Sequence, residues 1–255
     1  FKFYMKILIL GDAPSSHIIK WANALSDYGH QICVFSLLKS DSSQFRKNIK
    51  IINMEISTKL KFLGGGNYLK LLYLLTLPAI NKLIKEIKPD ILHAHYASSY
   101  GLLGSLTKFH PYILSIWGGD VYSFPRKSFL HKQIFNFNLK AADKILSTSE
   151  VMAKEIKKYT NKQIFITPFG IDIETFKPES KIKLIEGEFD FLIGTIKGLE
   201  EIYGIEYLID AYCMVKEKLK NKKIKLLIVG TGSLENKIKS LIAERSLSDE
   251  IILTG

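Results

Sequence analysis

Short apolar runs of strand length alternate along the chain with segments whose apolar residues recur at helical spacing. Such alternation is the signature of βαβ units, which build a parallel sheet covered by helices. The pattern therefore predicts an α/β fold with a doubly wound parallel sheet. The candidate strands of its first part are Lys6–Leu10, Ile32–Ser36, Ile49–Asn53, Ile91–His93, Tyr112–Ile116, Ile145–Ser147 and Ile164–Ile166.

The periodicity fades between Pro168 and Gly187, where further proline and glycine interrupt any regular element. A second array of three strands and two helices follows, with strands at Phe191–Thr195, Ile224–Val229 and the residues up to Gly255. We expect an N-terminal Rossmann-like domain over 1–168, a linker over 169–187 and a partial C-terminal domain over 188–255. The second domain is expected to be incomplete, because no helix follows its last strand to cover it.

The formal net charge of +11 and the pI near 9.4 favour a polyanionic partner. An anionic membrane surface or a phosphorylated substrate fits this charge. Nucleic acid is disfavoured, because the lysines are not clustered with interleaved aromatic residues. Many of them are expected to form solvated helix faces.

The two cysteines, Cys33 and Cys213, have no paired spacing, which favours a reduced cytosolic compartment over a disulfide framework. The longest apolar stretch, Leu69–Ile80, is interrupted by Lys70 and is shorter than the ~18 residues that a membrane-spanning helix needs. We expect it to form a core helix after a mobile loop at Gly64–Gly66. The alternative is that it lies on a bilayer surface.

Two loops have the geometry of ligand-binding turns. The segment Gly11–His17 joins the first strand to the first helix, so it lies at the carboxyl edge of the sheet, where open α/β folds bind ligands. The segment Gly230–Ser233 follows a strand and opens a helix, as phosphate-binding loops do. The third glycine of a dinucleotide fingerprint is missing, which favours a single nucleotide phosphate pair over NAD. A plain turn with a capping serine remains the alternative for the first loop.

Two further segments end strands with polar residues. His93 and His95 are two residues apart, so their side chains are predicted on one side of the sheet, with His95 beyond the strand and facing the cleft. A metal site is not expected, since no third ligand has suitable spacing. After the next strand, the glycines of Trp117–Asp120 allow a sharp turn that presents Asp120 to a ligand, unless Asp120 merely caps its loop.

In this order and spacing the segments resemble glycosyltransferase family 4, whose members are retaining enzymes of the GT-B architecture. The resemblance covers nearly the whole chain. It is carried by Gly11–Trp21, Pro89–Tyr96, Trp117–Tyr122, Ala142–Ser149, Thr167–Asp172, Gly194–Lys197, Tyr203–Ala211 and Ile228–Gly232.

The resemblance implies a nucleotide-sugar donor held by the second domain, an acceptor held by the first, and transfer with retained configuration, without a metal or other cofactor. Thr195 and Tyr203 stand where Arg and Lys are common, so Lys197 is the candidate cation for the donor diphosphate. The catalytic candidates are Asp120, His95 and Lys197. The donor-binding candidates are Gly11, Thr195, Lys197, Tyr203, Gly230 and Gly232; the acceptor-binding candidates are His17, Trp117 and Tyr96.

We therefore expect a cytoplasmic glycosyltransferase that uses a glycan or lipid-linked glycan acceptor and contacts the inner face of the cell membrane peripherally. No match to the family's donor-binding glutamates occurs before Gly255, so the chain as given is expected to be inactive. Two alternatives remain open: a nucleotide-sugar 2-epimerase of similar architecture, and a non-catalytic binding or scaffold module.

Overall fold

A computed structural model describes residues 4–54, 67–177, 185 and 187–255. The chain divides into two compact units, unit 1 over Phe1–Ile173 and unit 2 over Glu174–Gly255. This division falls inside the predicted linker, of which residues 178–184 and 186 lie outside the described residues. The predicted loop at Gly64–Gly66 lies outside them as well.

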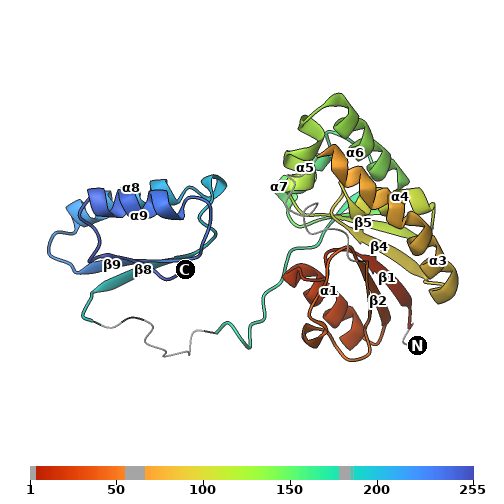
Figure 1. The fold of residues 1–255 in the computed structure, drawn as a ribbon, viewed down its shortest axis with the longest axis horizontal. Coiled ribbons are helices and arrows are strands. Elements are labelled where there is room, and N and C mark those ends of the chain that lie inside the picture. Colours follow the sequence, from red (N-terminus) through yellow and green to blue (C-terminus); the bar gives the residue numbers. More distant parts are fainter. Residues whose placement is uncertain (1–3, 55–66, 178–184, 186) are drawn as a thin grey trace. The chain divides into compact units, whose positions relative to one another are not determined.

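Unit 1 contains a seven-stranded sheet in the order β3-β2-β1-β4-β5-β6-β7 (Figure 1). All neighbouring strands run parallel. The strand order reverses between β1 and β4, which leaves a crevice at the carboxyl edge of the sheet. The strands are β1 Lys6–Leu10, β2 Gln31–Ser36, β3 Lys50–Asn53, β4 Ile91–His95, β5 Tyr112–Ile116, β6 Lys144–Ser147 and β7 Ile164–Ile166.

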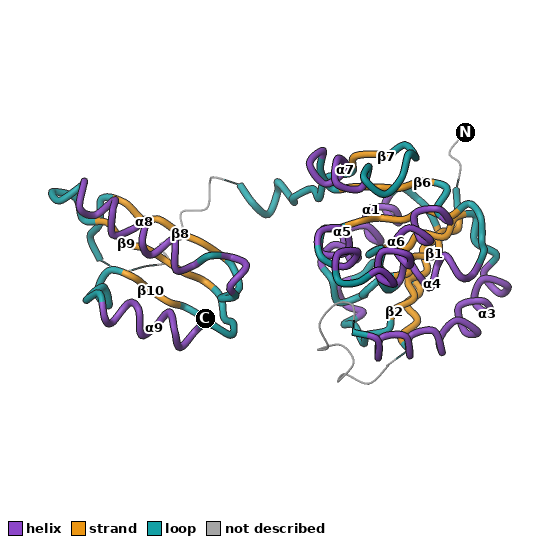
Figure 2. Tube along the Cα trace, turned by 90° about the horizontal axis from the view of Figure 1, so that it is seen from above, coloured by secondary structure: helices purple, strands orange, loops and turns teal. Residues whose placement is uncertain are grey.

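Helices of unit 1 surround these strands (Figure 2). The α-helices are α1 Ser16–Asp27, α3 Leu77–Ile87, α4 Tyr100–Thr107, α5 Gly119–Tyr122, α6 Phe129–Ala141 and α7 Glu150–Ile156. The described 3₁₀ segments are η1 Ser42–Gln44, η2 Tyr68–Thr76 and η3 Phe124–Arg126.

The strands of unit 1 bury apolar side chains on both faces, as strands of an open parallel sheet must. Alternate residues divide between two clusters, so that Leu8 and Leu10 pack with α3, α4, α6 and α7 on one face. Ile7 and Ile9 pack with α1 on the other. The sheet is therefore the central layer of unit 1, and its carboxyl edge is held rigidly by the two cores.

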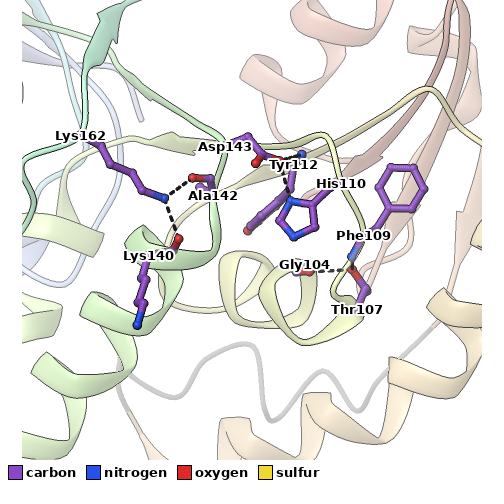
Figure 3. A network of polar contacts seen from close by, with 9 residues as sticks. All are labelled: Gly104, Thr107, Phe109, His110, Tyr112, Lys140, Ala142, Asp143 and Lys162. Carbon is purple, nitrogen blue, oxygen red and sulfur yellow. Dashed lines mark hydrogen bonds and ion pairs between the residues drawn. The ribbon is translucent and has the colours of Figure 1, made fainter.

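Local signals in the sequence set the helix ends. The side chain of Ser15 accepts a hydrogen bond from the amide of His17 and caps α1. Asp143, which directly precedes β6, accepts hydrogen bonds from the amide of Tyr112 and from His110 Nδ1 (Figure 3). Nearby, Lys162 Nζ donates to the carbonyls of Lys140 and Ala142 at the end of α6 (Figure 3).

Unit 2 contains a three-stranded parallel sheet in the order β10-β9-β8. Its strands are β8 Phe191–Ile196, β9 Ile224–Val229 and β10 Ile251–Leu253, and its helices are η4 Glu201–Tyr203, α8 Ile205–Lys218 and α9 Glu235–Glu244. Both α-helices lie on the same face of the sheet (Figure 1) and share one core with it. The two parallel sheets confirm the predicted fold class.

Two predictions of local structure were wrong. His95 is the last residue of β4 rather than a residue beyond it. The stretch Leu69–Ile80 does not form one core helix: its first part is η2, where Leu69, Leu72 and Leu75 are exposed, and only α3 buries Ile80 in the core. Among the described residues, no helix combines the length and the apolar character needed to cross a membrane.

Candidate functional site

A pocket of about 430 Å³ lies in unit 1 at the point where the strand order reverses. The end of β4 and the residues that follow β1, β2, β4 and β5 form part of its wall, and η2, α4, η3 and α6 supply the rest. Crevices at this point of open α/β sheets are the usual ligand sites of such folds. Its polar and aromatic lining includes Asp12, Lys70, His95, Tyr96, Tyr100 and Trp117.

His95 lies on the pocket wall with a side chain that is only 1% exposed. Neither of its ring nitrogens has a hydrogen-bonding partner among the described residues. Burial, with smaller contributions from His93 and His17, holds the pKa of His95 well below 6.5, so the ring is neutral. A neutral imidazole offers one donor and one acceptor, and leaving both unpaired in a buried place costs free energy that a bound hydroxyl group recovers.

His93 has the same orientation, as its spacing predicts. The two rings are 4.0 Å apart, and Nε2 of His93 lies 2.8 Å from Ser115 Oγ. His93 is thus paired within the fold, whereas both ring nitrogens of His95 lack a partner among the described residues. Among the described residues, no group of three or more His, Cys, Asp or Glu side chains is arranged to hold a metal ion.

An aromatic cluster surrounds His95. The ring of Trp117 lies 5.3 Å from that of His95 and 5.3 Å from that of His17. His17 in turn stacks on Phe169 at 3.6 Å. The structure therefore brings together the predicted acceptor candidates His17 and Trp117, and it adds Phe169, whose only signal was its place in the segment that carries the family resemblance.

Tyr96, the third acceptor candidate, follows β4 with a φ of 79°. Non-glycine residues adopt this left-handed region at a cost, and such strain clusters at functional sites. Burial, with the nearby carboxylates of Asp120 and Asp12, raises the pKa of Tyr96 to about 12. Its hydroxyl therefore stays protonated and able to donate a hydrogen bond beside the pocket.

Asp120 does not face a ligand, contrary to the prediction. Its side chain is 0% exposed, and its carboxylate accepts hydrogen bonds from the backbone amides of Ala97, Trp117 and Gly118. Burial raises the pKa of Asp120, although the hydrogen bonds from these amides act in the opposite direction. The residue ties the loop after β4 to the loop after β5, which is the loop-capping alternative. The prediction rested on Gly118 and Gly119, which allow a sharp turn but do not determine which way the Asp120 side chain points.

Two charged residues of the pocket escaped the sequence analysis. Asp12 Oδ1 accepts a hydrogen bond of 2.6 Å from the hydroxyl of Tyr100. Lys70 lines the same pocket. Burial lowers the pKa of Lys70; the nearby carboxylate of Asp12 acts in the opposite direction, and the positive charge of Lys127 lowers the pKa further. The available signal for Lys70 was that it is the one charged residue in the apolar run of Leu69–Ile80.

Gly11, predicted to contact the donor, is buried, and its amide donates to the carbonyl of Phe35. A Cβ atom at this position would meet the side chain of Ile18. The structure gives Gly11 a packing role between β1 and α1.

The donor candidates of unit 2 gather at the carboxyl end of β8. Thr195 lies in the strand, Lys197 directly follows it, and the ammonium of Lys197 lies 4.3 Å from the ring centre of Tyr203. Such a cation–π contact orients a lysine without neutralising it. Lys197 is exposed, so its charge is accessible to an anion.

The loop after β9 packs on the segment that contains Lys197. Gly230 has a φ of 145°, and a Cβ there would collide with the carbonyl oxygen of Lys197. A Cβ at Gly232 would collide with the backbone of Leu199, whose amide donates to the carbonyl of Thr231. Both glycines are thus required for loop-to-loop packing.

The amide at the start of α9 already has a partner. Ser233 donates from its amide and its hydroxyl to the two carboxylate oxygens of Glu200, at 3.0 and 2.6 Å. An anion at the amide of Ser233 has to displace Glu200. Lys197 is the candidate in unit 2 whose charge stays open to solvent.

Two family profiles match the chain. One described as "Glycosyl transferase 4-like" matches residues 6–149, and one described as "Glycosyl transferases group 1" matches residues 176–255. An uncharacterized glycosyltransferase of Methanocaldococcus jannaschii is 24% identical over 220 residues, which cover 84% of this chain and 56% of the relative. The chain thus spans about half the length of this curated relative.

Solved structures share the fold across nearly the whole chain. Sucrose-phosphate synthase from Thermosynechococcus elongatus superposes with a TM-score of 0.78 at 15% identity, over 98% of this chain and 70% of that one. Anabaena HepE, solved in complex with UDP, superposes with a TM-score of 0.69 at 14% identity, over 99% of this chain and 69% of that one.

Proposed function

The chain belongs to the glycosyl transferase 4-like family, and from this premise we propose that it transfers a sugar from a nucleotide-sugar donor to a glycan or lipid-linked glycan acceptor with retained configuration. Unit 1 binds the acceptor in the pocket at the carboxyl edge of its sheet. Unit 2 supplies a cation to the donor diphosphate. The reaction takes place in the cytoplasm, at the inner face of the cell membrane, in polysaccharide assembly.

The observation that carries the proposal is the unpaired, buried imidazole of His95 in the wall of the pocket. Most buried polar groups are hydrogen-bonded, so a buried donor and acceptor without protein partners are available to a ligand or to water. A sugar hydroxyl both donates and accepts, so it matches a neutral imidazole. The ring of Trp117, 5.3 Å from His95, adds an apolar surface of the kind on which a sugar ring packs.

On the donor side, charge develops on the diphosphate as the glycosidic bond breaks, and a fixed cation stabilises it. Lys197 meets this need without a metal ion. The ring of Tyr203 orients its ammonium, and the Gly230 loop holds the Lys197 backbone by a hydrogen bond from the Lys197 amide to the Val229 carbonyl. The ammonium of Lys197 is open to a phosphate anion. The amide and hydroxyl of Ser233 are less available, because both already donate hydrogen bonds to Glu200.

A transfer assay on the product of the complete gene tests the proposal. Labelled nucleotide sugars are supplied with glycan and lipid-linked acceptors, and we expect release of the nucleoside diphosphate together with a glycosylated product of retained configuration. Without acceptor, no epimerised nucleotide sugar is expected. Epimer formation instead of transfer, or no turnover with any donor, contradicts the proposal.

Two variants divide the roles of the units. Lys197→Ala is expected to lower kcat/KM for the donor by about 10²–10³-fold, the usual cost of removing one group that stabilises developing charge. His95→Ala is expected to raise the acceptor KM by about tenfold or more, the cost of a lost buried hydrogen bond. Lys220→Ala, an exposed lysine elsewhere in unit 2, is the matched control and is expected to leave both parameters unchanged.

A further inference from the structure

The 3₁₀ geometry of η2 sorts the apolar residues of Tyr68–Thr76 by a period of three, because residues three apart eclipse one another in such a helix. Leu69, Leu72 and Leu75 share one side and are 55%, 46% and 76% exposed. None of them lines the pocket, whereas Tyr68, Lys70, Leu71, Tyr73 and Leu74 do. We call the exposed row Leu69, Leu72 and Leu75 the leucine stripe.

The start of α6 adds more exposed apolar surface beside η2. The hydroxyl of Tyr68 lies 3.5 Å from Ser128 Oγ, and its ring lies 5.2 Å from that of His131. Between these two residues, Phe129 is 77% and Leu130 is 49% exposed. We call the leucine stripe together with Phe129 and Leu130 the apolar face. Exposed apolar surface on two neighbouring segments is typical of an interaction site.

The two segments that form the apolar face carry charges of one sign, and two of their basic residues are paired with acidic residues outside them, Lys82 with Glu86 and Arg126 with Glu155. Residues 67–85 and 121–142 contain no Asp or Glu. The same two stretches contain seven lysines and arginines: Lys70, Lys82, Lys85, Arg126, Lys127, Lys132 and Lys140. Exposed leucine and phenylalanine flanked by basic residues without acidic ones are the composition of elements that lie in the interface of an anionic bilayer.

We propose that unit 1 docks on an anionic phospholipid bilayer through the apolar face, with Lys127 and Lys132 contacting the lipid headgroups. A second copy of the chain fits this face less well, because a symmetric contact places the same cations against each other. Where the proposed acceptor is lipid-linked, which rests on the proposed function, η2 forms both the wall of the acceptor pocket and the contact with the membrane that holds the acceptor.

Co-sedimentation with vesicles tests the docking. The parent chain is expected to sediment with vesicles of phosphatidylcholine mixed with phosphatidylglycerol and not with phosphatidylcholine alone. The double variant Leu75→Glu/Phe129→Glu is expected to lower the partition coefficient at least tenfold. Glu at the first position of α6 favours the helix, so this variant is expected to fold. Its far-ultraviolet circular dichroism spectrum and melting temperature check this.

Two control variants separate docking from nonspecific attraction by net charge. Val151→Glu places one new glutamate at another exposed apolar position of unit 1, and Lys220→Glu in unit 2 changes the net charge by two units, as the double variant does. Both are expected to bind as the parent does, whereas Lys132→Glu is expected to weaken binding about fivefold or more. Equal binding by the double variant and the parent overturns the proposal. So does an equal loss in Lys220→Glu and Lys132→Glu, or binding to neutral vesicles alone.

A second measurement separates this proposal from the proposed function. The double variant is expected to retain turnover of a water-soluble acceptor analogue although it no longer binds the vesicles. Turnover is measured on the product of the complete gene; if that product sediments with anionic vesicles but transfers no sugar, docking stands and the proposed function fails. If the apolar face instead mediates a concentration-dependent dimer that the double variant abolishes, the bilayer proposal fails.

Discussion

Unit 1 holds all six histidines and both tryptophans of the chain, whereas residues 174–255 contain neither residue type. In unit 1 burial determines the chemistry of two polar groups of the site: His95 is neutral and Tyr96 stays protonated. In unit 2 the candidate cation Lys197 is exposed. Unit 1 thus provides a pocket with oriented hydrogen-bonding groups, whereas unit 2 provides an exposed positive charge next to closely packed loops.

This difference makes the two units separable by experiment. The fluorescence of Trp21 and Trp117 reports on unit 1 alone, and hydrogen exchange measured by peptide follows both units in the intact chain.

The largest effect is expected for Asp120→Ala in unit 1. Its carboxylate satisfies the amides of Ala97, Trp117 and Gly118, and at about 1–3 kcal/mol for each unsatisfied buried group the free energy of unfolding is expected to fall by about 4 kcal/mol. Denaturant titration followed by tryptophan fluorescence measures this loss. Asp120→Asn, which keeps one acceptor oxygen, is expected to lose about half as much. A loss below about 1 kcal/mol for Asp120→Ala means that Asp120 does not hold the loops.

The next effect is expected for Gly230→Ala in unit 2. The new methyl group meets the carbonyl oxygen of Lys197 in a backbone conformation that disfavours any side chain, so a loss of about 3 kcal/mol is expected. Hydrogen exchange should increase in β8 and β9 while the tryptophan transition stays unchanged. Gly170→Ala is the matched control, because a Cβ at Gly170 meets nothing within 4 Å. Unchanged exchange in β8 and β9 shows that the loop has room.

The smallest effect is the acid sensitivity of unit 1. Burial lowers the pKa of His93 to about 3, from 6.5 when unfolded. The unfolded chain therefore binds the proton first as the pH falls, so stability present above pH 6.5 is lost down to about pH 3. This amounts to about 2 kcal/mol between pH 7 and pH 5.

The comparison with His93→Gln isolates this contribution, since other titrating groups are common to both proteins. The parent should lose more stability than the variant over this pH range, as measured by tryptophan fluorescence. Equal pH dependence of the two proteins indicates that His93 is protonated in the folded state. Hydrogen exchange in unit 2, which has no histidine, should change less than in unit 1.

The strands were predictable because short apolar runs between turn residues are typical of buried parallel strands. The bounds of β1, β5, β7 and β9 agree with the sequence prediction. The shared side of His93 and His95 followed from the strand period of two.

The site was less predictable, because its features depend on contacts between segments far apart in the sequence. Nothing near Asp120 announces that the amide of Ala97 lies 2.8 Å from its carboxylate. The glycines of the loop after β9 read as phosphate contacts, yet they make room for the backbone of the loop after β8. In η2 the apolar residues are so dense that a period of 3.0 and one of 3.6 fit the sequence equally well.

The pitch of η2 determines which of its apolar residues share a side. At three residues per turn Leu69, Leu72 and Leu75 fall in line, but at 3.6 residues per turn they spread over an arc of about 120°. Leu71, which lines the pocket, would then come beside Leu75. The separation of an outward apolar row from a pocket wall is therefore a property of winding rather than of composition, and rewinding the segment would merge the two surfaces.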